Sequence, residues 1–162
     1  MAVRLALVSI LVAGILAPVA VADPPEHIPL PPSEPFVIEG SCDFPVLLEE
    51  VANRTKLKVF SDGREIITGV LKVRLTNLDD PSNSLVLNIS GPAFFTPRDD
   101  GGFRLKATGA WLWFFAPGEL GEGSPGMLFT THGQARLVVT GAGDVSFELL
   151  SGTRREVCPR LA

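Results

Sequence analysis

The sequence is poor in the residues that build metal centres and catalytic triads. Its 162 residues include only two histidines, His27 and His132, and only two cysteines. A zinc centre needs three or four nitrogen, sulfur or oxygen ligands, and no such group stands together in the sequence. No cluster of lysine and arginine is present and the net charge is −4, which argues against nucleic acid as a partner. We therefore expect no metal, no cofactor and no nucleic acid.

Long apolar runs are also scarce, and the only one lies at the N-terminus. Residues 1–22 predict a signal peptide, with a positive charge at Arg4, an apolar run over Leu5–Ile15 and a small-residue cleavage site at Ala20-Val21-Ala22. An uncleaved anchor is the alternative interpretation. No later run approaches the roughly 20 residues of a membrane span. We expect cleavage before Asp23 and secretion to the extracellular space, with no membrane span left.

Proline is concentrated in the segment that follows. Residues 23–35 hold six of the 14 prolines, and proline fixes φ and lacks an N–H donor. We interpret 23–35 as an extended proline-rich tether that builds neither a helix nor a ladder. A polyproline ligand for another protein is the alternative. Residues 36–162 are then expected to form a single β-sandwich domain.

From residue 36 onward, apolar and polar residues alternate with a period of two, and no segment shows a convincing helical stripe. Turn signals such as Ser61-Asp62-Gly63 separate the alternating segments. The pattern predicts an all-β, antiparallel sandwich or barrel of about eight or nine strands. Val46–Ala52 also admits a short helix, but a strand fits its surroundings better. The clearest expected strands are Thr55–Val59, Leu71–Thr76, Leu85–Ser90, Phe103–Thr108, Leu137–Val139 and Val145–Leu149.

The two cysteines, Cys42 and Cys158, stand near opposite ends of the β region. In a secreted protein an even pair predicts a disulfide, which requires Cα atoms within about 7 Å. The first and last elements of the domain are therefore expected to be neighbours. A redox or metal site is the alternative, but neither cysteine has a histidine or a third cysteine near it in sequence.

The most distinctive run is aromatic and spans Trp111–Phe115. On a strand, Trp111, Trp113 and Phe115 share one face and Leu112 and Phe114 the other, so both faces are apolar. Such a strand is either buried on both sides or carries an exposed recognition patch. We expect Leu112 and Phe114 to be buried and the other three rings to be at least partly covered by the loop that follows.

That loop, Ala116–Gly126, is rich in glycine and carries two glutamates. Long loops beside a rigid β scaffold often hold binding residues. The candidate binding residues are therefore Trp111, Trp113, Phe115, Glu119 and Glu122. The alternative is a buried strand followed by a flexible loop.

Other residues give weaker signals. His132 stands in Thr130–Gly133, which we interpret as a solvated turn, and Ser124 lacks the G-x-S-x-G pattern of a nucleophile elbow. The acidic pairs Asp79-Asp80 and Asp99-Asp100 would suit calcium only if two loop tips met, and ordinary turns are the simpler interpretation. Glycosylation acceptor patterns begin at the asparagines Asn53 and Asn88.

Several stretches resemble small secreted proteins of high-GC actinobacteria. They share an opening Cys-x-Phe-Pro, here Cys42-Asp43-Phe44-Pro45, and a Cys-Pro ending, here Cys158-Pro159. Further stretches with this likeness are Ser41–Val46, Asp62–Gly69, Leu75–Leu78, Asn88–Pro92 and Val157–Ala162. The ratio of ten arginines to four lysines fits such a genome. Because those proteins have no assigned activity, the resemblance implies secretion and a disulfide but no site residues.

Three functions fit this sequence. The first is a secreted non-enzymatic domain that binds an extracellular ligand or protein through the aromatic strand and its loop. The second is a small hydrolase that uses carboxylates such as Glu119 or Glu122. The third is a barrel that holds an apolar ligand, with Trp111 and Trp113 lining its interior. The absence of a catalytic set favours the first function.

Overall fold

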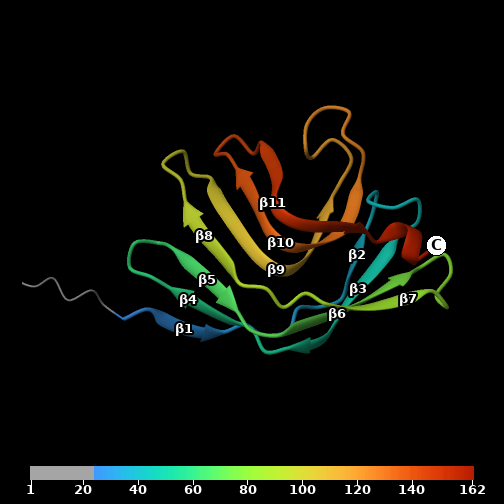
Figure 1. Cartoon of the computed structure of the whole chain (residues 1–162), viewed down its shortest axis with the longest axis horizontal. Helices are drawn as coiled ribbons and strands as arrows, with labels where there is room; N and C mark the ends of the chain where they lie inside the picture. Colours follow the sequence, from blue (N-terminus) through green and yellow to red (C-terminus); the bar gives the residue numbers. More distant parts are fainter. Residues whose placement is uncertain (1–23) are drawn as a thin grey trace, which may run out of the picture.

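The computed structural model describes residues 24–162, so the expected signal peptide lies outside the described residues. The described chain forms two antiparallel sheets, one of seven strands in the order β1-β4-β5-β8-β9-β10-β11 and one of four in the order β2-β3-β6-β7 (Figure 1). The predicted all-β antiparallel class is confirmed. The elements are β1 (Glu26–Pro29), β2 (Phe36–Ile38), β3 (Val46–Asn53), β4 (Lys56–Val59), β5 (Glu65–Thr68), β6 (Leu71–Asn77), β7 (Ser84–Asn88), β8 (Ala93–Pro97), β9 (Phe103–Phe115), β10 (Met127–Val139), β11 (Val145–Glu156) and the 3₁₀ turn η1 (Cys158–Arg160).

Two of the sequence interpretations change. The proline-rich segment does join a ladder, because β1 pairs with β4 and His27 lies opposite Lys58. Proline is tolerated there since β1 is an edge strand. The Thr130–Gly133 segment is not a turn but the middle of β10. The strand interpretation of Val46–Ala52 is confirmed by β3.

Three strands of one sheet continue into the other. The links are two to four residues long: Arg54–Thr55 between β3 and β4, Gly69–Val70 between β5 and β6, and Ile89–Pro92 between β7 and β8. The β8–β9 ladder ends at the pair Ala93–Ala107. The chain that precedes Ala93 belongs to β7 and the four-stranded sheet, whereas the part of β9 that follows Ala107 remains in the seven-stranded sheet. The two sheets therefore separate at this point, and β7 and β9 border a fork.

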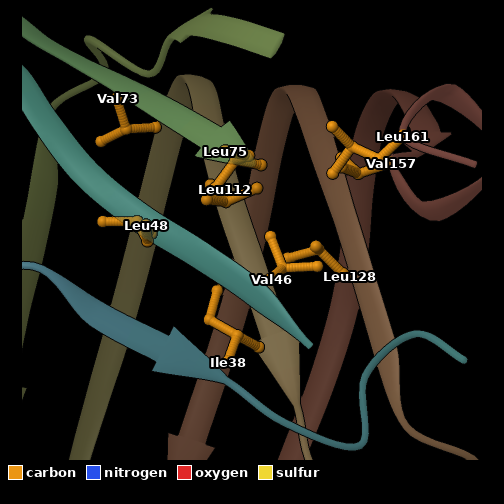
Figure 2. Packing of buried hydrophobic residues seen from close by; sticks show 9 residues of the cluster. All are labelled: Ile38, Val46, Leu48, Val73, Leu75, Leu112, Leu128, Val157 and Leu161. Carbon is orange, nitrogen blue, oxygen red and sulfur yellow. The ribbon is translucent and has the colours of Figure 1, made fainter. Parts of the chain in front are cut away.

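The space between the sheets holds a cluster whose fully buried side chains are all aliphatic, which we call the aliphatic core. Figure 2 shows its side chains converging between the four-stranded sheet and strands β9 and β10. The disulfide Cys42–Cys158 packs against this core with a Cα–Cα distance of 5.6 Å, which confirms the predicted bridge. The core residues are Ile38, Val46, Leu48, Val73, Leu75, Leu112, Leu128, Val157 and Leu161.

The opposite face of the seven-stranded sheet carries a second cluster, the aromatic core. Its rings pack at close range: the centroid of Phe147 lies 4.9 Å from that of Trp113 and 5.3 Å from that of Phe129. Leu120 of the Ala116–Gly126 loop packs against this cluster. Its buried members are Ala93, Leu105, Ala107, Trp113, Phe115, Phe129 and Ala135.

A line of glycines crosses the three longest strands. Gly133 of β10 lies opposite both Gly109 of β9 and Gly152 of β11. All three have positive φ, of 145°, 81° and 98° respectively, a conformation that glycine adopts at little cost. A Cβ on Gly133 would lie 2.2 Å from the Ser151 carbonyl oxygen. The three strands therefore bend together at one level, between the part of β9 paired with β8 and the part packed on the second sheet.

No helix in residues 24–162 has the length and apolarity that a membrane crossing requires.

Candidate functional site

The aromatic strand is mainly structural. Trp113 and Phe115 are only 6% and 3% exposed, and the Trp113 indole N–H donates to the Thr131 hydroxyl at 2.9 Å. Two parts of the expectation are confirmed, since Leu112 is buried and Leu120 of the following loop covers the rings. The expected burial of Phe114 is wrong. Its side chain is 45% exposed, because it lies outside the aliphatic core and the nearby ring of Phe36, 5.9 Å away, is itself exposed.

The two loop glutamates do not form a site with these rings. A carboxylate oxygen of Glu119 accepts the N–H of Ala116 at 2.8 Å, so this side chain closes its own loop. Glu122 is exposed at the loop tip. Of the five candidate residues, only Trp111 borders a cleft that also holds polar side chains from other strands.

That cleft, the inter-sheet cleft, lies at the fork where β7 and β9 separate. Its volume is about 240 Å³. Five elements supply its walls: β7, β9, β10, β11 and η1. The lining residues are Val86, Leu87, Asn88, Ala110, Trp111, Thr130, His132, Arg155 and Arg160.

Strand register explains why polar side chains gather in it. Thr130 of β10 lies between Leu112 and Arg155, and His132 lies opposite Ala110. Side chains directly opposite on neighbouring strands stand about 5 Å apart on the same face. Because Leu112 faces the second sheet, Thr130, His132 and Arg155 face it too. Arg160 reaches the same cleft from η1, which the disulfide at Cys158 holds against the core.

The cleft is cationic. Two guanidinium groups and one imidazole line it, and no carboxylate does. Within residues 24–162 the ion pairs use other arginines, so Arg155 and Arg160 keep their donors for a ligand. The paired arginines are Arg64, Arg74, Arg98, Arg136 and Arg154.

Two neighbouring groups are held in place. The indole N–H of Trp111 donates to the Thr108 carbonyl at 3.2 Å, and its ring lies 5.9 Å from that of Trp113, tilted by 37°. The Oδ1 atom of Asn88 accepts hydrogen bonds from the N–H and the hydroxyl of Ser90. The amide NH₂ group of Asn88 therefore remains available as a donor. The cleft therefore offers an anion one positioned amide donor and two unpaired guanidinium groups beside an apolar wall.

The acidic pairs are turn residues. Arg98 donates from Nε and Nη2 to Asp100, and this pairing, helped by the Gly102 N–H, lowers the pKa of Asp100. Asp80 accepts the N–H and hydroxyl of Ser82. In the described part of the chain, no three histidine, cysteine or carboxylate side chains converge as metal ligands.

Sequence reasoning missed Asn88, Arg155 and Arg160. Their positions in the cleft depend on strand register and on the link between β7 and β8, which alternation alone does not specify. The sequence did contain a signal that His132 lies on a strand, because Leu128, Thr130 and His132 follow one another with a period of two. No protein-family model matches the chain, and the searches of curated proteins and of solved structures found no match either.

Proposed function

We propose that this protein is a secreted, non-enzymatic binding domain that holds a small organic anion in the inter-sheet cleft. One observation carries the proposal: Arg155, Arg160 and His132 line a cleft that contains no carboxylate. A guanidinium group presents a planar fork of donors that matches carboxylate and phosphate oxygens. The disulfide supports secretion, because such bonds persist in oxidising compartments.

The size and walls of the cleft narrow the ligand. Its volume of about 240 Å³ is below the roughly 300–1,000 Å³ of pockets for drug-sized molecules. One sugar ring or one acidic end of a longer molecule fits such a space. Val86, Leu87 and Ala110 provide an apolar wall for the body of that ligand. The best match is a carboxylate or phosphate carried on a single ring.

The other two functions have less support. A carboxylate-based hydrolase needs two carboxyl groups about 5–10 Å apart across the substrate, and Glu119 is occupied in its own loop. An apolar-ligand barrel needs Trp113 to face an open interior. Its ring instead packs against Phe147 and its N–H is bound by Thr131.

Thermal shift and calorimetric titration with phosphate, sulfate, glucuronate and neutral glucose test the proposal. We expect saturable stabilisation by at least one anion and none by glucose, since a ligand that binds only the folded state raises its melting temperature. The double variant Arg155→Ala/Arg160→Ala should lose this stabilisation while keeping its β circular dichroism.

Arg54→Ala is the matched control, because Arg54 is exposed and lies outside the cleft. It should respond to anions like the unmodified protein. If anions stabilise the unmodified protein, the double variant and Arg54→Ala equally, the stabilisation comes from general ion binding, and the proposal is overturned. So would the absence of saturable stabilisation by every anion.

A further inference from the structure

A second cationic surface lies on the seven-stranded sheet, away from the inter-sheet cleft. Along β9, Leu112 faces the four-stranded sheet, whereas Lys106 and Arg104 on the same face are exposed. The glycine line at Gly109 separates these two parts. The face around Lys106 therefore has no second sheet over it and is open to a partner.

Register places residues that are distant in sequence in one row across all seven strands. Residues directly opposite share a face of the sheet. The seven-strand row, read from β1 to β11, is His27, Lys58, Ile66, Phe94, Lys106, Arg136 and Glu148. Arg104, which lies opposite Thr96, adds a cation to the neighbouring row on the same face. We call the part formed by Lys58, Phe94, Arg104, Lys106 and Arg136 the cationic face.

The middle of this face is hollowed around a phenylalanine ring. Phe94 is 38% exposed. A hollow of about 460 Å³ lies on one side of it, lined also by Arg104 and Lys106, and a smaller one of about 100 Å³ is lined by Phe60. Both hollows include Phe94 and Thr96, so they adjoin. Together they form an extended groove across β5, β8 and β9, with room for a chain rather than a single small ion.

Several carboxylates border the face; two of them are paired, whereas Glu65, which lines the smaller hollow, forms no ion pair within residues 24–162. Glu148 lies 3.6 Å from Arg136, and Asp100 pairs with Arg98 beside the Arg104 end of the face. Lys58 and Lys106 form no ion pair in the part of the chain that the structure describes. Both lysines are therefore free for an anionic partner.

We propose that the cationic face binds a linear anionic polysaccharide, with Phe94 under a sugar ring and the lysines and Arg104 on its acidic groups. An exposed aromatic ring provides an apolar platform for the C–H face of a sugar. Lys58 and Lys106 are three strand spacings apart, roughly 14 Å. This distance is longer than one sugar ring, so it suits a polymer that carries acidic groups along its length.

Two other polyanions match less well. Double-stranded DNA carries one charge per about 1.7 Å, which four spaced cations on a chain of net charge −4 do not match. A membrane-bound surface inserts several large apolar side chains into the lipid interface. Among the residues that line the groove, the only exposed hydrophobic side chain is that of Phe94, since Phe60, Ile66 and Phe95 are partly buried.

Affinity electrophoresis and calorimetry with polygalacturonate and heparin test this proposal; the first probe carries carboxylates alone, and the second carries sulfates in addition to carboxylates. We expect binding to at least one of them, weakening as salt rises. Binding should fall about tenfold or more in Lys106→Glu and Phe94→Ala. Lys72→Glu is the matched control, because Lys72 is exposed on the other sheet, and it should bind normally.

The proposal is overturned by any of three results: no binding to either glycan, equal loss in Lys72→Glu, or tighter binding to duplex DNA or to phosphatidylserine vesicles. Circular dichroism must show each variant folded, and Lys106→Glu changes only an exposed side chain. The double variant Arg155→Ala/Arg160→Ala should keep full glycan binding, so the cleft and the cationic face can fail independently.

Discussion

The two faces of strand β9 bury different kinds of side chain. Leu112 joins the aliphatic core, which has a sheet on either side and the Cys42–Cys158 disulfide at its margin. Its neighbour Trp113 joins the aromatic core, to which only the seven-stranded sheet and the following loop contribute. Two stacked sheets lie about 10 Å apart, a gap that Val, Leu and Ile fill by interdigitation.

A single bent sheet has no opposing layer, so its side chains must cover one another. Large rings suit this because each buries about 150–250 Å². Phe147 contacts Trp113, Phe115 and Phe129, and the Arg154 guanidinium lies 3.8 Å from the centre of the Phe129 ring. The aliphatic core therefore depends on the two sheets being held together, whereas the aromatic core depends on individual rings.

The largest expected effect is on the connection between the sheets. Replacing Cys42 and Cys158 by serine should lower the free energy of unfolding by roughly 4–5 kcal/mol, because the bridge closes a loop of more than 100 residues. Denaturant unfolding of the variant and the oxidised protein measures the loss. A change below about 1 kcal/mol would show that the aliphatic core holds the sheets together without the bridge.

Within the aromatic core, Trp113→Ala should cost roughly 3–5 kcal/mol, since it leaves a large cavity and removes the hydrogen bond to Thr131. Phe114→Ala, one position along, is the matched control. Because Phe114 is 45% exposed, the cost there should be below about 1 kcal/mol. Comparable losses in the two variants would contradict the assignment of the two faces of β9.

The boundary between the two parts of the sheet is tested by Gly133→Ala. The positive φ costs about 1–3 kcal/mol for a residue with a side chain, and the new Cβ would also clash with the Ser151 carbonyl. Gly143→Ala has a positive φ of 91° with no atom near the new Cβ, so it reports strain alone. A larger drop in melting temperature for Gly133→Ala is expected. Equal drops would mean that the strands need no close approach at the glycine line.

The sequence was enough to predict the class, the disulfide and one face of each main strand. Alternation predicts which residues share a face, and two cysteines permit only one bridge. Alternation did not predict the exposure of Phe114, because both faces of Trp111–Phe115 are apolar and only the extent of the second sheet distinguishes the two faces. The cationic face was hidden as well, since only strand register places Lys58, Phe94 and Lys106 in one row on the same face of the sheet.

The smallest expected effect lies outside both cores, at the turn between β8 and β9. Hydrogen bonds from the Arg98 side chain, and then from the Gly102 N–H, lower the pKa of Asp100 below its value of about 3.9 in an unfolded chain. A lowered pKa means that the carboxylate stabilises the fold fully above about pH 4 and loses this contribution as pH falls further. Asp100→Asn keeps an acceptor for Gly102 but removes the charge, so its melting temperature should be slightly lower than that of the unmodified protein near neutral pH. The two melting temperatures should converge below about pH 4.

Asp99→Asn serves as the control, because Asp99 is exposed and forms no ion pair within residues 24–162. If the difference between Asp100→Asn and the unmodified protein stays constant down to low pH, the Arg98–Asp100 pair does not contribute to stability.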